Sequence, residues 1–235
     1  MGNVQILLRQ HVGAPCAAIV KAGDEVKKGT LIATPTGLGA NIFSSVYGVV
    51  EEVLEDRIVI KPDEEQKDEF VPIDVAEDAS KLDMVKAAGI VGMGGAGFPT
   101  GIKLGTDLNG GYVLVNAAEC EPYLTSDYRK MLEEPEKLIG GLKIILQLFD
   151  NAKGYICIED NKPDCIEKLS ALVANEPRIE VKAMKTKYPQ GGERMLIYAA
   201  TGRSINSSML PADAGCVVDN VDTVVAIYKA IVMGM

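Results

Sequence analysis

The residues with the clearest chemistry lie in a glycine-rich stretch, Gly92–Gly101, which reads GMGGAGFPTG, and in Lys103 just beyond it. Five of these ten residues are glycine. Without a Cβ atom their backbone amides can approach an anion closely, and the Lys103 ammonium adds a cation. The stretch therefore predicts a phosphate-binding loop. A merely flexible loop is the alternative that the spelling alone leaves open, because short motifs match often by chance.

The spacing of Gly92, Gly94 and Gly97 matches the dinucleotide fingerprint letter for letter. That fingerprint requires a strand before it and a helix after it. Here a helix is expected before the glycines, and Pro99 and Gly101 interrupt the segment after them. A Walker loop is excluded as well, because the glycines do not lead into a Gly-Lys-Ser/Thr sequence. The residues by themselves leave the ligand undetermined.

An amide and two carboxylates stand in the segment 116–122, which reads NAAECEP. Asn116 ends a predicted strand, and its ordinary role would be that of a turn residue. Glu119 and Glu121 stand one residue apart, which is also typical of a solvated strand edge. Cys120 lies between the two acids, which would raise its pKa and make it a poor thiolate. A binding role for this segment therefore stays one of two interpretations.

Composition limits the function classes. The chain has 235 residues, of which 47% are hydrophobic and 24% charged, as in a soluble globular protein. Its net charge of −9 argues against nucleic-acid partners. Five cysteines without a C-x-x-C pair argue against a disulfide frame or a metal site. Without an apolar run long enough to cross a bilayer, we expect a cytoplasmic chain with no direct membrane insertion.

Short β-rich fragments separated by turns fill residues 1–62 and predict a small barrel or sandwich. Two half-motifs, at 20–32 and 45–50, are similar to those of biotinyl and lipoyl carrier domains, which are barrel-sandwich hybrids. In those carriers the hairpin between the halves presents a lysine for modification. Here the hairpin 35–40 reads PTGLGA and has no lysine. We therefore expect the hybrid fold without the carrier function. His11, the only histidine, lies here and is not expected to act in chemistry.

Residues 63–80 are acidic and are expected to form a linker. From residue 81 to 235 apolar strands alternate with helices, which predicts a Rossmann-like α/β domain with a mostly parallel sheet. The expected strands are 112–116, 154–159 and 179–184. The expected helices are a short one from Ser80 to Gly89, then 135–150, 162–174, 192–200 and 222–233. Parallel sheets bind ligands at the carboxyl ends of their strands.

Four motifs in order carry a resemblance to a known family. The segment GGAGFPTG at 94–101 with Lys103 resembles the FMN loop of the NADH-oxidising flavoprotein subunit of respiratory complex I, and 116–122 resembles its second motif. The segments YPQGGE at 188–193 and VDNVDT at 218–223 resemble the C subunit of the Rnf electron-transport complex, as does the domain order. The hairpin at 36–45 favours a sister branch, the proline-reductase-associated electron-transfer proteins.

The resemblance implies FMN and NADH as cofactors and assigns the residues that contact them. These residues are Gly92, Gly94, Gly95, Gly97, Phe98, Lys103, Asn116, Glu119, Glu121, Gly192, Glu193, Asn220 and Thr223. Lys103 and the first glycines would hold the FMN phosphate and ribityl chain. Asn116 would hydrogen-bond the flavin, Glu121 would contact NADH and Phe98 would stack on its adenine.

Some of these residues have a plainer alternative. An isolated phenylalanine such as Phe98 is more often part of a core. Asn220 and Thr223 would ordinarily cap a helix. The amides of Gly192 and Glu193 open a predicted helix, so they are placed to face an anion.

Two departures from the family pattern bear on NADH. Complex I subunits have Arg where this chain has Met93, and Asp where it has Ala118. The chain thus lacks one cation and one acceptor for the nicotinamide nucleotide. Rnf subunits of this type also continue into a ferredoxin domain, whereas this chain ends at Met235. We therefore expect a truncated chain, with iron–sulfur clusters only in the missing region or in a partner.

The resemblance predicts an NADH dehydrogenase-type flavoprotein module that oxidises NADH through FMN. The cofactor carries the chemistry, so no catalytic acid or base and no metal ligand is assigned. The expected partners are other electron-transfer subunits, of an Rnf-type complex or a reductase, at the inner face of the membrane. The alternative is a non-catalytic docking or assembly module with a vestigial flavin pocket.

Overall fold

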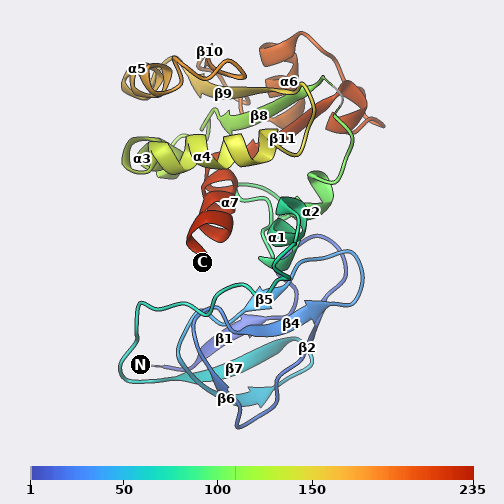
Figure 1. The fold of residues 1–235 in the computed structure, drawn as a ribbon, viewed down its shortest axis with the longest axis vertical. Coiled ribbons are helices and arrows are strands. Elements are labelled where there is room, and N and C mark those ends of the chain that lie inside the picture. Colours follow the sequence, from blue (N-terminus) through green and yellow to red (C-terminus); the bar gives the residue numbers. More distant parts are fainter. Residues whose placement is uncertain (1, 109) are drawn as a thin grey trace. The chain divides into compact units, whose positions relative to one another are not determined.

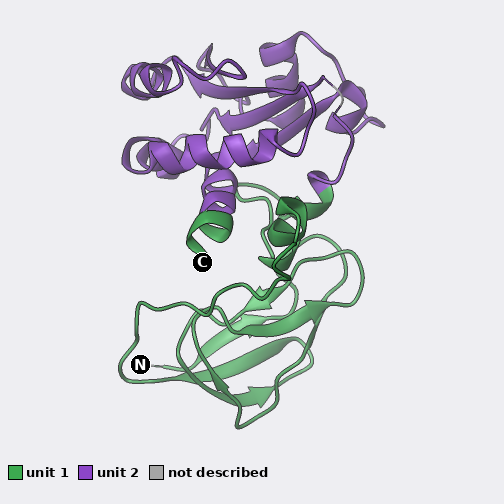
Figure 2. Ribbon diagram, in the orientation of Figure 1, with its two compact units in different colours: residues 1–102, 229–235 green, residues 103–228 purple. Residues whose placement is uncertain are grey.

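The computed structural model describes residues 2–108 and 110–235. The chain divides into two compact units (Figure 2). Unit 1 comprises residues 1–102 and 229–235, and unit 2 comprises residues 103–228. The segment 81–102, which includes the glycine stretch, thus clusters with the N-terminal part of the chain. The expected boundaries at 62 and 80 stay a prediction.

Unit 1 contains two antiparallel sheets of short strands (Figure 1). One sheet has the order β1-β7-β6-β3 and the other β2-β4-β5. The strands are β1 (Val4–Leu7), β2 (Cys16–Ala18), β3 (Glu25–Val26), β4 (Leu31–Pro35), β5 (Ile42–Phe43), β6 (Gly48–Val53) and β7 (Arg57–Pro62). The predicted N-terminal sandwich of short strands is confirmed.

The core of this sandwich is aliphatic. Ile32, Ile58 and Ile60 are fully buried and pack with Ile6 and Val50, so strands of both sheets contribute to one cluster. Alternate positions along these strands point inward, as the period of two requires. Helix α1 (Lys81–Ala87) comes next, and Ser80 caps it by accepting a hydrogen bond from the Asp83 amide at 3.1 Å. The predicted start of this helix is therefore confirmed.

Unit 2 is built on one four-stranded parallel sheet with the order β10-β9-β8-β11. Its strands are β8 (Tyr112–Ala117), β9 (Lys153–Glu159), β10 (Ile179–Met184) and β11 (Cys216–Asn220). The helices between residues 100 and 233 are α2 (Thr100–Lys103), α3 (Ser126–Glu133), α4 (Pro135–Leu146), α5 (Pro163–Leu172), α6 (Glu193–Thr201), the 3₁₀ turn η1 (Pro211–Ala214) and α7 (Val221–Met233). The predicted parallel α/β domain is confirmed.

Helices α4 and α6 cover opposite faces of this sheet (Figure 1). Gly154 of β9 lies against Leu142 of α4, since a Cβ atom there would stand 3.1 Å from the leucine side chain. The neighbouring strand position, Tyr155, packs on the other side in a cluster with Leu196 and Ile197 of α6. The strands of a sheet covered on both faces are continuous apolar runs, and the segments 112–115 and 154–158 have this character.

The strand order contains one reversal. The chain passes from β8 to β9 to β10 in one direction and then returns to place β11 on the other side of β8. The switch point of the sheet therefore lies between β8 and β11. Asn116 and Asn220 are register partners at the carboxyl ends of these two strands. A crevice for ligands in a doubly wound sheet is expected at this position.

Among the described residues, no helix has both the length and the apolar character that a bilayer-spanning segment needs.

Candidate functional site

The glycine stretch of unit 1 forms a loop closed at its base. Val91 and Pro99 form an isolated antiparallel bridge, and the Gly92 amide donates to the Phe98 carbonyl at 2.8 Å. These contacts bring the two ends of the stretch together. The next helix, α2, has only four residues. The context is thus not that of the dinucleotide fingerprint, as the sequence predicts.

The tip of this loop is exposed backbone. Gly94 and Gly97 have φ values of +74° and +68°, a conformation that residues with a side chain rarely adopt. A Cβ atom on Gly95 would meet nothing within 4 Å. Met93 and Phe98 are 41% and 36% exposed, so Phe98 is not a core residue. The loop offers amides and one aromatic face to a ligand.

Lys103 lies in unit 2 and is held by β11. Its ammonium donates to the Val218 carbonyl at 2.7 Å and to Asp219 Oδ1 at 3.0 Å. The Asp219 side chain is fully buried, while that of Lys103 is 24% exposed. Burial raises the pKa of Asp219, and the charge of Lys103 opposes that shift. The cation that the sequence assigns to a phosphate is therefore already paired with a carboxylate.

Asn116 joins two of the sequence motifs. Its Nδ2 donates to the Gly191 carbonyl at 2.8 Å, and its Oδ1 accepts from the Ala118 amide at 3.3 Å. Gly191 also donates from its amide to the Cys120 sulfur at 3.3 Å. A Cβ atom on Gly191 would stand 2.3 Å from the Ala118 carbonyl oxygen, so only glycine fits. The segments 116–122 and 188–193 are thus locked side by side.

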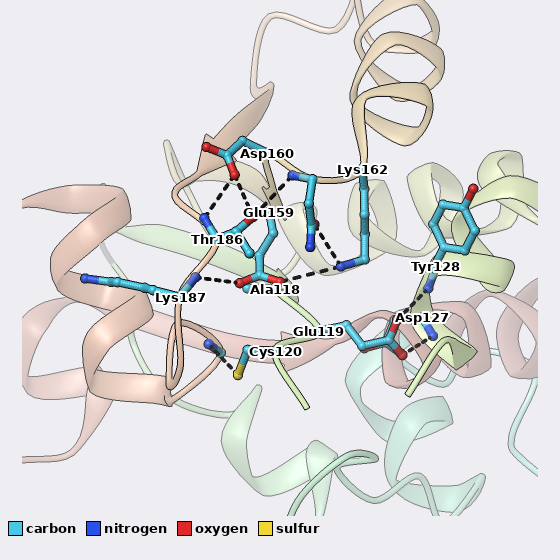
Figure 3. A network of polar contacts seen from close by, with 12 residues as sticks. Ala118, Glu119, Cys120, Asp127, Tyr128, Glu159, Asp160, Lys162, Thr186 and Lys187 are labelled. Carbon is cyan, nitrogen blue, oxygen red and sulfur yellow. Dashed lines mark hydrogen bonds and ion pairs between the residues drawn. The ribbon is translucent and has the colours of Figure 1, made fainter. Parts of the chain in front are cut away.

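Glu119 caps helix α3 (Figure 3). Its Oε1 accepts from the Asp127 amide at 2.9 Å and its Oε2 from the Tyr128 amide at 3.2 Å. The Ser126 hydroxyl donates to the same carboxylate at 3.2 Å. An anion at a helix N-terminus satisfies amides that have no partner within the helix. Both oxygens are therefore engaged in the structure, a role that the sequence does not indicate because it does not predict α3.

Replacing Glu119 with Ala is expected to lower the free energy of unfolding by about 1 kcal/mol, the usual cost of losing a helix cap. Urea unfolding followed by circular dichroism measures the change. Glu133→Ala is the matched control, since Glu133 is an exposed acid at the other end of α3 that pairs with Arg129. Equal losses in the two variants would contradict the capping role.

Glu121 is exposed and faces the motif at 188–193. Its carboxylate lies beside the Tyr188 hydroxyl and raises the pKa of that phenol. The Tyr188 side chain is 69% exposed. The two residues therefore present a carboxylate and an aromatic ring to solvent from neighbouring segments, which suits a nucleotide that stacks and hydrogen-bonds.

Asn220 is oriented by hydrogen bonds on both sides. Its Oδ1 accepts from the Asp222 amide at 2.8 Å, and its Nδ2 donates to Asp127 Oδ2 at 2.8 Å. Asp127 is 9% exposed. Burial and the neighbouring Glu119 carboxylate raise the pKa of Asp127 to about 7, against the lowering effect of the Asn220 bond. Asp127 is a buried acid at the switch point that the sequence does not reveal.

A second group of charged residues lies where β9 and β10 end (Figure 3). Glu159 is 1% exposed and pairs with Lys162 at 3.5 Å. Asp160 accepts from the Thr186 hydroxyl at 2.6 Å and from its amide at 3.0 Å. The sequence does not reveal this group either. It ties the two strand ends together, and within the described residues no cluster of metal-ligating side chains is formed.

The remaining assigned residues lie at helix starts. Gly192 precedes α6 in an extended conformation, with no side chain to cap the helix. Glu193 is the first residue of α6 and is exposed. Thr223 is fully buried in the first turn of α7. The first-turn amides of α6 thus remain at the carboxyl edge of the sheet, where an anion is favoured.

Family models match both parts of the chain. Residues 1–74 match the RnfC barrel-sandwich hybrid domain, and residues 85–229 match the Nuo51 FMN-binding domain. The two matches have the order that the sequence motifs predict.

Curated relatives match nearly the whole chain. The C subunit of the proton-translocating ferredoxin:NAD(+) oxidoreductase complex of Clostridium ljungdahlii is 42% identical over 99% of this chain and 54% of its own length. The C subunit of the Na(+)-translocating complex of Acetobacterium woodii is 42% identical over 99% and 56%. The C subunit of the ion-translocating oxidoreductase complex of Pseudomonas aeruginosa is 36% identical over 97% and 32%. The chain therefore spans about half the length of the first two relatives, and a third of the last.

Solved structures support the same relationship. A crystal structure of an NAD+-reducing [NiFe]-hydrogenase in the air-oxidised state is 27% identical, with a TM-score of 0.55, over 63% of this chain and 29% of its own. The H2-reduced state gives 26% and 0.53, over 64% and 30%. The chain thus belongs to the RnfC family of Rnf complex subunits, in which an RnfC barrel-sandwich hybrid domain precedes a Nuo51 FMN-binding domain.

Proposed function

We propose that this chain binds FMN and serves flavin-linked electron transfer with NADH as the reductant. One observation carries the proposal. The carboxyl ends of β8 and β11 at the switch point bring together Asn116, Asn220 and, through its contact with Asp219, Lys103. Motifs far apart in the sequence thus supply amides and a cation at one edge of one sheet. The family of the FMN-binding domain supports the choice of ligand.

The residues at this edge fit a flavin nucleotide. Each asparagine side chain has two N–H donors, and hydrogen bonds within the protein use one on Asn116 and one on Asn220. The Lys103 ammonium has three donors and makes two hydrogen bonds to β11. Donors therefore remain for the polar ring edge and for the phosphate. Unit 1, taken by itself, has open amides around Gly95 of the kind that bind anions.

FMN, when bound, would supply the hydride acceptor for NADH and the means of releasing electrons singly. In unit 2, Glu121 and Tyr188 would bind and orient the nucleotides. The stacking role of Phe98 in unit 1 stays a separate prediction. No side chain is proposed to transfer a proton. The contacts that the resemblance assigns to individual residues stay a prediction.

The electron acceptor lies outside this chain in our proposal. The relatives are named as subunits of ferredoxin:NAD(+) oxidoreductase complexes and are about twice as long. We propose an iron–sulfur centre in a partner subunit or in further sequence as the acceptor. The chain would then work in the cytoplasm, at the inner face of the membrane, through such a complex.

A docking module with a vestigial flavin pocket is the second candidate. It is favoured by the engagement of assigned side chains within the protein, above all both oxygens of Glu119 on helix α3 and the ion pair of Lys103 with Asp219. Met93 in place of an arginine favours it too, because it removes a cation from the glycine loop.

Two titrations separate the candidates. Purified protein incubated with FMN and then freed of excess is expected to stay yellow, and NADH is expected to bleach the flavin under anaerobic conditions. A colourless protein supports the docking module. A yellow protein that NADH does not bleach keeps FMN but requires another reductant.

Gly95→Ala tests the glycine loop by itself. Since nothing lies within 4 Å of the added methyl, the free energy of unfolding is expected to stay within about 0.5 kcal/mol of the parent. If the loop amides contact the phosphate, the methyl crowds the ligand at a cost of about 1–3 kcal/mol, and the FMN Kd should rise by about 5- to 150-fold. Gly2→Ala, at another glycine with open space and without a positive φ, is the control for effects of the methyl on folding. An unchanged FMN Kd would remove the loop from the site.

A further inference from the structure

Asp219 is expected to lower the stability of the fold at its position. Its side chain is fully buried in β11, and only one of its oxygens has a partner, Lys103 at 3.0 Å. The other oxygen, Oδ2, is buried without a hydrogen bond to any described residue. A buried carboxylate with an unsatisfied oxygen costs several kcal/mol of desolvation that a single ion pair does not fully offset.

Stability alone does not account for this acid. Asparagine has nearly the same shape and could still accept a hydrogen bond from Lys103 without a buried charge, so filling this position does not by itself require an acid. The Glu193 carboxylate adds to the cost, because it raises the pKa of Asp219 further. Buried acids with an unsatisfied oxygen and a raised pKa are typical of functional sites.

The effect of Asp219 reaches a ligand only through Lys103. The Lys103 side chain is 24% exposed, whereas that of Asp219 is fully buried. The Val218 carbonyl at 2.7 Å and Asp219 Oδ1 fix two of the three ammonium donors. The third can meet an anion, and the carboxylate behind the ammonium cancels much of the charge that the anion would feel.

We propose that Asp219 is a positioning residue that acts as the internal counter-ion of Lys103. Its charge thereby weakens the electrostatic interaction between Lys103 and the phosphate of FMN. The inference rests on the proposed function, because it requires that Lys103 meets that phosphate. It predicts an effect that depends on the phosphate and not on the flavin ring. Riboflavin, which has the same ring and ribityl chain without the phosphate, is therefore the discriminating ligand.

The experiment compares FMN and riboflavin Kd values, from flavin fluorescence, for the parent protein, Asp219→Asn, Lys103→Met and the double variant. In Asp219→Asn the FMN Kd is expected to fall about tenfold at low ionic strength and less at high salt, since salt screens the uncovered charge. The riboflavin Kd should not change. In Lys103→Met the buried acid loses its partner and takes up a proton, so adding Asp219→Asn there should leave the FMN Kd unchanged.

Each result decides between the two claims. A higher FMN Kd in Asp219→Asn than in the parent would overturn the counter-ion role. So would a riboflavin Kd that changes as much as the FMN Kd, because either result indicates a structural role for Asp219. An unchanged FMN Kd in Asp219→Asn together with weakened binding in Lys103→Met would overturn the inference and leave the proposed function standing. If the parent does not bind FMN, both fail. Should Asp219→Asn not fold, Asp219→Ser, which is also neutral, is expected to give the same phosphate-selective gain.

Discussion

Replacing Lys103 with Met is expected to weaken FMN binding by about 10- to 150-fold, which corresponds to the 1.5–3 kcal/mol of a hydrogen bond to a charged group. The structure gives the physical reason. The ammonium is held at β11 by Val218 and Asp219, and the lysine side chain is partly exposed, so the cation would meet an anion without first being ordered. Methionine keeps most of the length of the side chain but not its charge. Titration of FMN fluorescence measures the change.

Two controls limit the interpretation of this result. Lys143→Met removes a lysine in the last turn of α4 that pairs with Glu176, and it should leave the FMN Kd unchanged. The riboflavin Kd should not change in Lys103→Met, because riboflavin has no phosphate. Equal FMN affinities in the parent and in Lys103→Met would remove Lys103 from the site.

Replacing Asp127 with Asn is expected to stabilise the protein by up to about 4 kcal/mol at pH 8 relative to pH 4. The folded pKa of Asp127 is raised to about 7 from 3.8, and each unit corresponds to about 1.4 kcal/mol. The folded state then binds more protons than the unfolded state between these values. The contribution of Asp127 to stability is therefore present at about pH 4 and is lost as the pH rises through about 7. Asparagine has no such loss.

The surroundings of Asp127 explain the direction. Burial is the largest cause, and the carboxylates of Glu119 and Asp222 add to it. The Asn220 amide and the Lys162 ammonium act in the other direction. An acid enclosed in this way holds its proton to near-neutral pH.

Urea unfolding from pH 4 to pH 8 measures the effect as the difference between Asp127→Asn and the parent. Glu133→Gln, an exposed acid on the same helix, is the control, and its difference from the parent should vary little with pH. A difference for Asp127→Asn that is constant over this range would contradict the raised pKa.

The order of domains and the parallel sheet are predictable because each depends on local patterns. The runs at 112–115 and 154–158 are apolar throughout, which indicates a sheet covered on both faces. Strand β11 is not predicted, since its short run Cys216–Asn220 comes after a long irregular segment and leads directly into α7. Helix α3 is not predicted because it is short, polar and separated from α4 only by Glu134.

The site is predictable only in part for the same reason. Asn116, Asn220 and Lys103 belong to motifs that can be read in order, and the structure places them at or on β8 and β11. Asp127 belongs to no motif, and Asp219 lies in the motif at 218–223 without a role of its own. Both acids are notable because they are buried. Their burial depends on β11 and α3, and the sequence predicts neither of these elements. The same gap hides the engagement of Glu119 with the α3 amides.

The central claim is that this chain binds FMN, and an equilibrium titration of FMN into the purified chain tests it most directly. The account predicts saturable quenching of flavin fluorescence at a single site, with a yellow protein after removal of free FMN and a Kd that rises in Lys103→Met. A chain that leaves flavin fluorescence unquenched and stays colourless would contradict it.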